Sequence, residues 1–402
     1  MPGSGGRADE LAEFRFYFVD MGQGDCTIIR SPTGHVYVVD CGSVGDLNAG
    51  TFTGAGTTMR AWSGGNPVTV ILTHPDRDHY NQLLSLLYWG LGGNNVNADH
   101  IYFSMSNGPA SPLGHYSQTA LAANLGFIGN PPLTEVTINA GVQQLQTWTN
   151  ANAYTAPAPP VALPAGVLEL AQGPAVPGVG GHAAWSLRIV AGNVPAATAT
   201  WTDVSNSASL MVVAQIGAEK VVITGDATQT TMDYVRLNHA AQVQDAEIFQ
   251  VPHHGSLTGL PTAAQRNLFN PRQALISVGI LTDGHKLPRF NVITAWQGAG
   301  RIGAHAQVVD YFMDSTQVLG YNTHQALAAI LTGPWAPYPT LSNTSGTFHW
   351  LQNPANAGPG AANTGFYGFT NNGYFLFRQV IAQDILETGI IAGRIETWLD
   401  GL

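Results

Sequence analysis

The stretch LTHPDRDHYNQL, residues 72–83, places two histidines and two aspartates within six positions: His74, Asp76, Asp78 and His79. Only 10% of the 402 residues are charged, so this concentration of coordinating side chains stands out. The run VTVILT directly before it, residues 68–73, is short, β-branched and apolar, which is typical of a strand buried on both faces. Because such a cluster at a strand exit has little structural use, we expect these four residues to bind a metal ion.

Further strands are predicted on both sides of this stretch. The alternation in FRFYFVD at 14–20 puts Phe14, Phe16 and Phe18 on one face of a strand. The segments CTIIR and HVYVVD flank SPTG, which predicts a hairpin. Strand signals resume at AWSLRIV, ASLMVVAQI, KVVIT, DAEIFQVP and QALISVG, with helical patterns around 229–240 and 261–268. The segment NQLLSLLYW after the cluster also predicts a helix.

Six of the predicted strand exits deliver an aspartate or a histidine. They lead to Asp25, Asp40, His74, Asp226, the pair His253 and His254, and His285. Sites in layered α/β folds form where loops leave the carboxyl edges of strands, so these side chains converge if the exits share one edge. We expect Asp25 to lie near the site, and Asp40 either to cap a turn or to orient a ligating histidine.

Neutral imidazole and carboxylate groups bind Zn²⁺, Mn²⁺ or Fe²⁺ well. A pair of such ions, about 3.5–4 Å apart, can clamp a scissile phosphate or carbonyl and lower the pKa of a bound water toward about 7. We expect the other histidines to be ordinary structural or surface residues: His35, His100, His115, His182, His239, His305, His324 and His349.

Composition limits the class of protein. Hydrophobic residues make up 45% of the chain, enough for a sizeable core, and no run of about eighteen apolar residues predicts a membrane helix. The N-terminal segment has no apolar signal core, which favours a cytoplasmic location and no membrane partner. Two cysteines, Cys26 and Cys41, are too few for a disulfide framework. The formal net charge of −10 argues against binding of long nucleic acids.

Differences in amino-acid composition along the chain indicate a main domain and an extension. Between residues 85 and 200 the stretches NPPLTEV, TAPAPPVALPAGV and GPAVPGVGGH are rich in Pro, Gly and Ala, and we expect loops and insertions there. From about residue 300 the sequence becomes rich in Asn, Gly and aromatic residues. We therefore predict a domain at 1–299, with the insertion at about 90–200, and a C-terminal extension of unknown role at 300–402.

The segment HPDRDH resembles the signature loop His-x-His-x-Asp-His of the metallo-β-lactamase superfamily, with Asp76 where the middle histidine usually stands. Four stretches resemble, in order and spacing, the hydrolase domain of the ComEC competence proteins: VDMGQGDCTIIRSPTGHVYVVDCGS, LTHPDRDHYNQL, VVITGDA and VPHHGS. They cover roughly 14–90 and 205–290. The resemblance implies an α/β fold, specifically an αββα metallo-β-lactamase-like sandwich with a one- or two-metal site at its edge.

The resemblance also implies roles for individual residues. His74 and Asp76 would hold one Zn or Mn ion, and Asp78 and His79 a second, with Asp226 as the bridge. His285 would complete the second site, His253 and His254 would be ligand or general acid at the leaving group, and Asp78 would also orient the bridging water. Where the superfamily has a further histidine, the segment SNSASL offers Asn206, Ser207 and Ser209, which favours an oxygen-rich, Mn²⁺-tolerant centre.

The implied activity is hydrolysis of a phosphodiester. Arg77, Lys286 and Arg289 lie close to the predicted site in sequence, and a small basic rim of this kind suits a nucleotide or a short oligonucleotide. Two alternatives stay open. The same site could hydrolyse a lactone, thioester or amide in an apolar pocket, or the chain could be a metal-poor, non-catalytic binding domain.

Overall fold

The computed structural model describes the greater part of residues 12–277 and short segments beyond them. The described residues are 12–19, 21, 23–44, 49–88, 95–104, 115–116, 125–148, 158–175, 183–246, 248–271, 273–275, 277, 292, 295–296, 349–350, 367–368, 374–375, 378–380, 385–387, 390–391, 394–395 and 397–401. The predicted site residues His285, Lys286 and Arg289 lie outside them.

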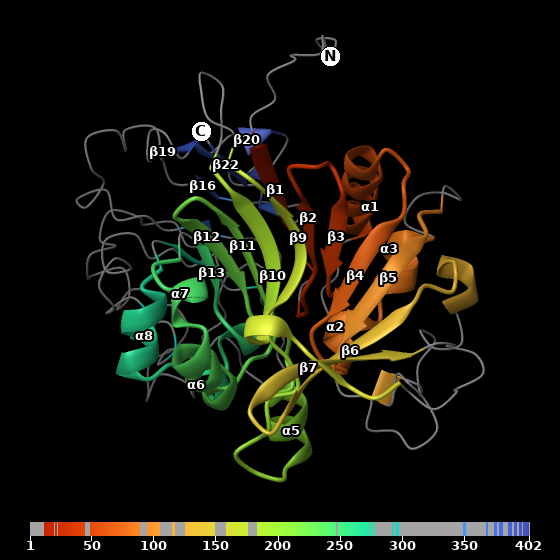
Figure 1. The fold of residues 1–402 in the computed structure, drawn as a ribbon. Coiled ribbons are helices and arrows are strands. Elements are labelled where there is room, and N and C mark those ends of the chain that lie inside the picture. The colour runs from red at the N-terminus through yellow and green to blue at the C-terminus, as the bar shows by residue number, and fades with distance from the viewer. Residues whose placement is uncertain are drawn as a thin grey trace, which may run out of the picture.

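The fold is mixed α/β and is built on two mixed β-sheets with several helices (Figure 1). In the first sheet, the strands from the N-terminal half follow the order β1 to β8. These are β1 Ala12–Val19, β2 Thr27–Arg30, β3 Val36–Val39, β4 Val68–Leu72, β5 Ala98–Phe103, β6 Leu133–Asn139, β7 Val142–Trp148 and β8 Val161–Ala162. Strands β3 to β6 pair in parallel, and the pairs on either side are antiparallel.

The second sheet has the order β14-β13-β12-β11-β10-β9. Its strands are β9 Leu168–Gly173, β10 Trp185–Ala191, β11 Met211–Ile216, β12 Glu219–Ile223, β13 Ile248–Gln250 and β14 Gln273–Leu275. Strands β12, β13 and β14 are parallel, so their carboxyl ends lie at one edge. Thus the hairpin and all five later strands predicted from sequence are confirmed.

Apolar side chains from both sheets meet in a core between them. Phe14, Phe16 and Phe18 of β1 lie in this core together with Leu187 and Ile189 of β10, which confirms the predicted period of two. On the other face of β1, Tyr17 and Val19 are also buried. The fold therefore depends on burial of two aromatic and aliphatic faces against each other, the main favourable contribution to folding.

Helices cover the outer face of each sheet (Figure 1). On the first sheet these are α1 Ala49–Ser63 and α3 Leu83–Leu87, and on the second they are α6 Gln229–Asn238, α7 Ala240–Val243 and α8 Ala263–Phe269. Two short helices, α2 Arg77–Tyr80 and α5 Trp201–Ser207, lie at the same end of the sheets. The 3₁₀ helices are η3 Leu125–Ile128, η4 Pro164–Gly166, η5 His253–Gly255 and η6 Leu257–Gly259.

The expectation of a loop was wrong for part of NPPLTEV, where β6 begins at Leu133, whereas the described residues of TAPAPPVALPAGV hold only the two-residue strand β8 and the short helix η4. Strands β5, β7 and β9, which no sequence pattern predicted, also lie between residues 90 and 200 and extend the sheets. Sequence patterns missed these strands because several of them, such as β7 and β9, carry glutamine and other polar residues on partly exposed faces. The domain boundaries themselves stay predictions.

Short strands also occur in the predicted C-terminal extension. They are β15 His349–Trp350, β16 Tyr367–Gly368, β17 Tyr374–Phe375, β18 Arg378–Val380, β19 Ile385–Glu387, β20 Ile390–Ile391, β21 Arg394–Ile395 and β22 Thr397–Gly401. Strand β22 pairs antiparallel with β1, so part of the extension joins the first sheet. Among the helices of the described chain, none has both the length and the apolar character needed to span a bilayer.

The core between the sheets gives a stability prediction. Leu187 is 0% exposed in that core, whereas Leu237 near the end of α6 is 70% exposed. We expect Leu187→Ala to lower the free energy of unfolding by about 2–5 kcal/mol, because it removes buried methyl groups and leaves a cavity. The matched variant Leu237→Ala should change it by no more than about 0.5 kcal/mol. Urea denaturation measures both, and equal losses would contradict the assigned core.

Candidate metal centre

The predicted coordinating residues converge where loops leave the carboxyl ends of β3, β4, β12 and β13. Thr73 and His74 follow β4, and Asp76 is the N-cap residue of α2, which carries Asp78 and His79 in its single turn. Asp226 follows β12, and His253 begins η5 after β13. The parallel pairings bring the exits of β3 and β4 together in the first sheet and those of β12 and β13 together in the second.

The Asp226 carboxylate lies at the centre of this group and is buried. Its Oδ1 atom is 3.1 Å from His79 Nε2 and 3.6 Å from His254 Nε2. Its Oδ2 atom is 3.6 Å from His74 Nε2 and 3.5 Å from His253 Nε2. Each oxygen therefore faces two imidazoles, and Asp226 divides the site into two halves.

Two further aspartates of the signature stretch border these halves. Asp76 Oδ2 is 3.6 Å from His74 Nε2, and Asp78 Oδ2 is 3.4 Å from His254 Nε2. One potential ligand atom from each of Asp25, His79, Asp226 and His254 lies within 4.8 Å of the others, and all four residues are buried. This group of four could hold a metal ion.

Hydrogen bonds to Asp40 set the tautomers of His74 and His79. Thr73 donates its N–H and its hydroxyl to the Asp40 carboxylate, both over 2.7 Å, and His79 Nδ1 donates to Asp40 Oδ2 over 2.8 Å. Because the Thr73 hydroxyl hydrogen points to Asp40, its oxygen accepts from His74 Nδ1 at 3.1 Å. Both imidazoles thus donate from Nδ1 and turn Nε2 toward the site, where it can bind a metal once it carries no proton.

His254 has the same tautomer for a different reason. Its Nδ1 atom lies 2.8 Å from the backbone oxygen of Ser277, which can only accept. Three histidines from two separate loops therefore turn Nε2 toward the space around Asp226. This is the arrangement that metal-ligating histidines adopt, since a partner on one nitrogen orients the other.

Five buried atoms in this group have no hydrogen-bond partner among the described residues. They are Asp25 Oδ1, His74 Nε2, His79 Nε2, Asp226 Oδ1 and His254 Nε2. Leaving a buried polar atom without a partner costs about 1–3 kcal/mol. Five such atoms in one cluster fit a bound cation, because the donor set of imidazole nitrogens and carboxylate oxygens is one that divalent metals accept.

The pKa values reflect the dense charge around Asp226. Burial opposes ionisation of Asp226, but His253, His79, His254 and His74 outweigh it and hold its pKa well below the usual range. Burial likewise opposes the charged forms of His79 and His254. Nearby carboxylates, Asp226 foremost, outweigh that effect, raising the pKa of His79 well above its ordinary value and that of His254 to about 10. For His253 burial prevails and lowers the pKa.

The structure brings nine predicted residues together: Asp25, Asp40, His74, Asp76, Asp78, His79, Asp226, His253 and His254. Asp25 was expected beside the ligand group, whereas its carboxylate is one of the four groups that could hold the ion. Arg77 is exposed at the start of α2.

Sequence patterns gave no signal for the supporting roles of Thr73 and Ser277. A threonine that ends a strand and a serine after another strand are common, so their type alone does not indicate that they orient histidines. Ser205 and Asn206 lie beside the site on α5, and Ser205 Oγ donates to Asp76 Oδ2 over 3.3 Å.

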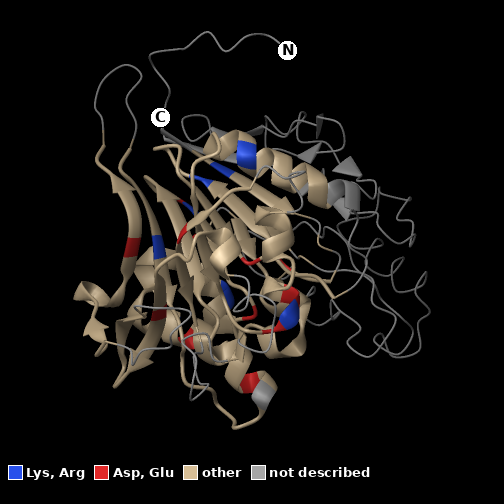
Figure 2. Cartoon of the chain, turned by 90° about the vertical axis from the view of Figure 1, so that its right-hand side faces the viewer, with Lys and Arg blue, Asp and Glu red and all other residues tan. Residues whose placement is uncertain are grey.

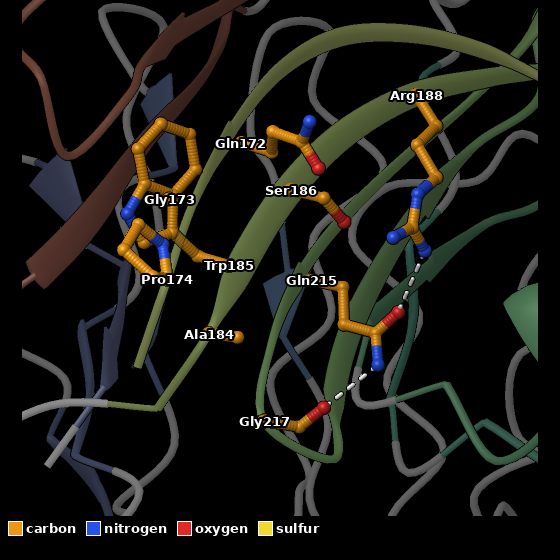
Figure 3. Close-up of a pocket in the computed structure, with 9 residues that line it drawn as sticks. All are labelled: Gln172, Gly173, Pro174, Ala184, Trp185, Ser186, Arg188, Gln215 and Gly217. Carbon is orange, nitrogen blue, oxygen red and sulfur yellow. Dashed lines mark hydrogen bonds between the residues drawn. The ribbon is translucent and has the colours of Figure 1, made fainter. Parts of the chain in front are cut away.

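A separate cavity of about 650 Å³ lies on the second sheet, between β9, β10 and β11 (Figure 3). None of its lining residues belongs to the metal cluster. Its guanidinium, that of Arg188, is bonded to Glu169 over 2.8 Å and to Gln215 over 3.2 Å. Acidic and basic residues are spread thinly over the described fold (Figure 2), whereas Asp25, His79, Asp226 and His254 lie close together.

No family model matches this chain, and no curated protein matches its sequence. Inference about function therefore depends on the geometry of the metal cluster and on the motifs in the sequence.

The raised pKa values of His79 and His254 predict that metal binding releases protons. Both shifts favour the protonated imidazoles in the metal-free protein, and a metal must displace any proton held on Nε2. We expect proton release on metal binding at pH 7, and less of it as the pH rises toward the pKa of His254, about 10. Calorimetry in buffers of different ionisation enthalpy measures this number. Binding heats that do not depend on the buffer would contradict it.

The close approach of Gly42 to the signature turn gives a second prediction. A Cβ atom at Gly42 would lie 2.2 Å from the backbone carbon of Asp78 and 2.3 Å from the nitrogen of His79. We expect Gly42→Ala to displace this peptide and weaken metal binding by about 10–100-fold. A Cβ atom at Gly126 would meet no atom within 4 Å, so Gly126→Ala is the matched control and should bind normally. Equal affinities of the two variants, measured by Mn²⁺ titration, would refute the assigned packing.

Proposed function

We propose that this chain is a metal-dependent hydrolase of phosphodiester bonds that belongs to the metallo-β-lactamase superfamily and is closest to the hydrolase domain of ComEC proteins. The observation that carries the proposal is the convergence of five buried ligand atoms, unpaired among the described residues, around the Asp226 carboxylate. Two sheets packed face to face with helices outside them support the αββα sandwich, whose site also lies at the sheet edge.

The two halves of the site suit one or two divalent ions. His79, His254, Asp25 and Asp78 surround the Oδ1 side of Asp226, and His74 and Asp76 border the Oδ2 side. The first group mixes imidazole and carboxylate donors, which accommodates both Zn²⁺ and Mn²⁺. The second side places the Asp76 carboxylate and the nearby Ser205 hydroxyl beside the imidazoles of His74 and His253, and this donor set also accommodates Zn²⁺ or Mn²⁺.

A divalent ion bound in such a site supplies Lewis acidity and makes a water nucleophilic at neutral pH. The protein contributes fixed ligand positions. Asp40 and Thr73 hold His74 and His79 in place, and Ser277 holds His254, so little reorganisation is needed when charge develops on the substrate. Burial of these groups strengthens their electrostatic effect because water screens them poorly.

A phosphate-containing substrate, such as a nucleotide or short oligonucleotide, suits the charge pattern. Arg77 is exposed on the turn that carries Asp78 and His79, and no ion-pair partner for it occurs within the described chain. A guanidinium there can bind a phosphate through two parallel hydrogen bonds. Lys286 and Arg289 would extend this rim, and His285 would add a ligand, but these three lie outside the described residues.

The test compares His79→Ala with the wild-type protein. We expect the purified protein to contain Zn or Mn and to hydrolyse a bis-phosphodiester dye, and His79→Ala to lose this turnover by at least about 100-fold because the ligand on Oδ1 of Asp226 is gone. His100→Ala is the matched control, since His100 bonds Thr134 on the first sheet and takes no part in the cluster.

Other outcomes separate the competing functions. Turnover of lactones or thioesters without turnover of the dye would favour carbonyl hydrolysis at the same metal centre. Absence of metal from the protein, even after incubation with excess Mn²⁺ or Zn²⁺, would favour a non-catalytic binding domain. Full activity of His79→Ala would refute the proposal that His79 binds the metal ion on which hydrolysis depends.

A further inference from the structure

The loop that follows β3, residues 40–44, is held against the end of α2 by a short ladder of hydrogen bonds. Cys41 N–H donates to the His79 oxygen over 2.7 Å, and Gln82 N–H donates to the Cys41 oxygen over 2.9 Å. These two bonds join the segment that carries Asp40 to the segment that carries His79. Because the two segments are far apart in sequence, contacts of this kind determine how Asp40 and His79 meet.

The Asn81 side chain adds two bonds to this ladder. Its Oδ1 atom accepts from Ser43 N–H over 2.8 Å, and its Nδ2 atom donates to the Ser43 oxygen over 2.8 Å. A backbone N–H can only donate and a backbone oxygen can only accept, so both partners require the same orientation of the amide group. Asn81 therefore binds the backbone of Ser43 at two points, as the opposite residue of an antiparallel hydrogen-bonded pair does.

The Asn81 amide and the Asp40 carboxylate lie at the two ends of the contact between these segments. Asn81 is two residues after His79, and Ser43 is three residues after Asp40. At the other end of the contact, His79 Nδ1 donates to Asp40 Oδ2 over 2.8 Å. The ladder is thus closed by the Asn81–Ser43 pair at one end and by the Asp40–His79 bond at the other, so a displacement at the first end is transmitted to the second.

Asp40 needs this support because its backbone is strained. Its φ of 56° lies in the left-handed region, which a non-glycine residue keeps only where its surroundings hold it there. The chain is held on both sides: Asp40 N–H donates to the Ile71 oxygen, and the Asn81 amide binds Ser43 further along the loop. Since the backbone angles of Asp40 direct its carboxylate toward His79, release of Ser43 should let that carboxylate turn away.

We infer that Asn81 is a positioning residue of the metal centre: its amide holds the loop that carries Asp40 against the segment that carries His79, and thereby fixes the direction in which the His79 ring faces Asp226. The inference rests on the metal centre of the proposed function. The two hydrogen bonds of the Asn81 amide go to the backbone of Ser43, so Asn81 acts on the centre through the chain and not as a ligand.

The first test compares Mn²⁺ binding by Asn81→Ala and Asn66→Ala. Asn81→Ala removes both bonds to Ser43, and we expect Mn²⁺ affinity to fall by about 10–100-fold, as on loss of a group that orients a ligand. Asn66 also bonds a backbone oxygen, that of Ser63 over 2.9 Å, but it lies before β4, at the end of that strand away from His74. The affinity of this matched control should stay within about twofold of wild type.

A second readout needs neither metal nor activity. The hydrogen on His79 Nδ1 is buried and bonded to Asp40, so it should exchange slowly with water and give an NMR signal that disappears in His79→Ala. In metal-free Asn81→Ala we expect this signal to shift and to exchange faster, because the Asp40–His79 bond loosens, whereas Asn66→Ala should leave it unchanged. Asn81→Gln keeps the amide on a side chain one methylene longer and should fall between wild type and Asn81→Ala in both measurements.

A double-mutant cycle with Asp40→Asn tests whether Asn81 acts through the Asp40–His79 bond. Asp40→Asn removes the charge that makes this bond strong. If both substitutions act on the same bond, the loss of Mn²⁺ affinity in the double variant should be at least about threefold smaller than the product of the two single losses. Thermal denaturation of each metal-free variant checks that it is folded.

The possible results distinguish this inference from the proposed function. Wild-type Mn²⁺ affinity or an unchanged His79 signal in Asn81→Ala would refute the inference, while the metal centre would stand if His79→Ala weakens binding. Single losses that multiply in the double variant would also refute it. If Asn81→Ala does not fold, Asn81→Gln decides, and wild-type affinity in that variant would overturn the inference. If His79→Ala itself leaves Mn²⁺ binding unchanged, the metal centre is wrongly placed and the proposed function fails as well.

Discussion

The buried Asp40 carboxylate accepts three hydrogen bonds, from the N–H and hydroxyl of Thr73 and from His79 Nδ1, at 2.7, 2.7 and 2.8 Å. Thr73 and His79 lie at the two ends of the signature turn, so one carboxylate clamps both ends. Charge-assisted hydrogen bonds of this kind are short and strong, and they also fix which nitrogen of each histidine faces Asp226. The ligand geometry of the whole site depends on this contact, because without it the rings of His74 and His79 could rotate.

Backbone strain is concentrated at the same place. Asp40, His253 and His254 all have positive φ, between 50° and 56°, a conformation that costs non-glycine residues about 1–3 kcal/mol. Local hydrogen bonds oppose this cost, since Asp40 N–H donates to the Ile71 oxygen and His253 N–H to the Gly225 oxygen. Strain that persists because its surroundings fix it is typical of functional sites, and here it orients the side chains that meet around Asp226.

Much of the fold and most of the cluster could be predicted from sequence, for identifiable reasons. Buried strands such as β4 and the phenylalanine face of β1 have strong apolar periodicity, and a strand exit dense in aspartate and histidine has few structural explanations. Strands with polar faces, such as β7, lacked that periodicity and were missed. The ligand position of Asp25 was also missed, because it depends on contacts between distant loops: Asp25 N–H bonds the Asp78 oxygen, and Gly42 packs against that same peptide.

Charge balance explains how a chain with so few ionisable groups can bury this many together. In the metal-free state the protons on His79 and His254 offset the carboxylates around Asp226. When one divalent ion replaces two protons, the net charge of the cluster is unchanged, so the fold does not have to accommodate a new buried charge.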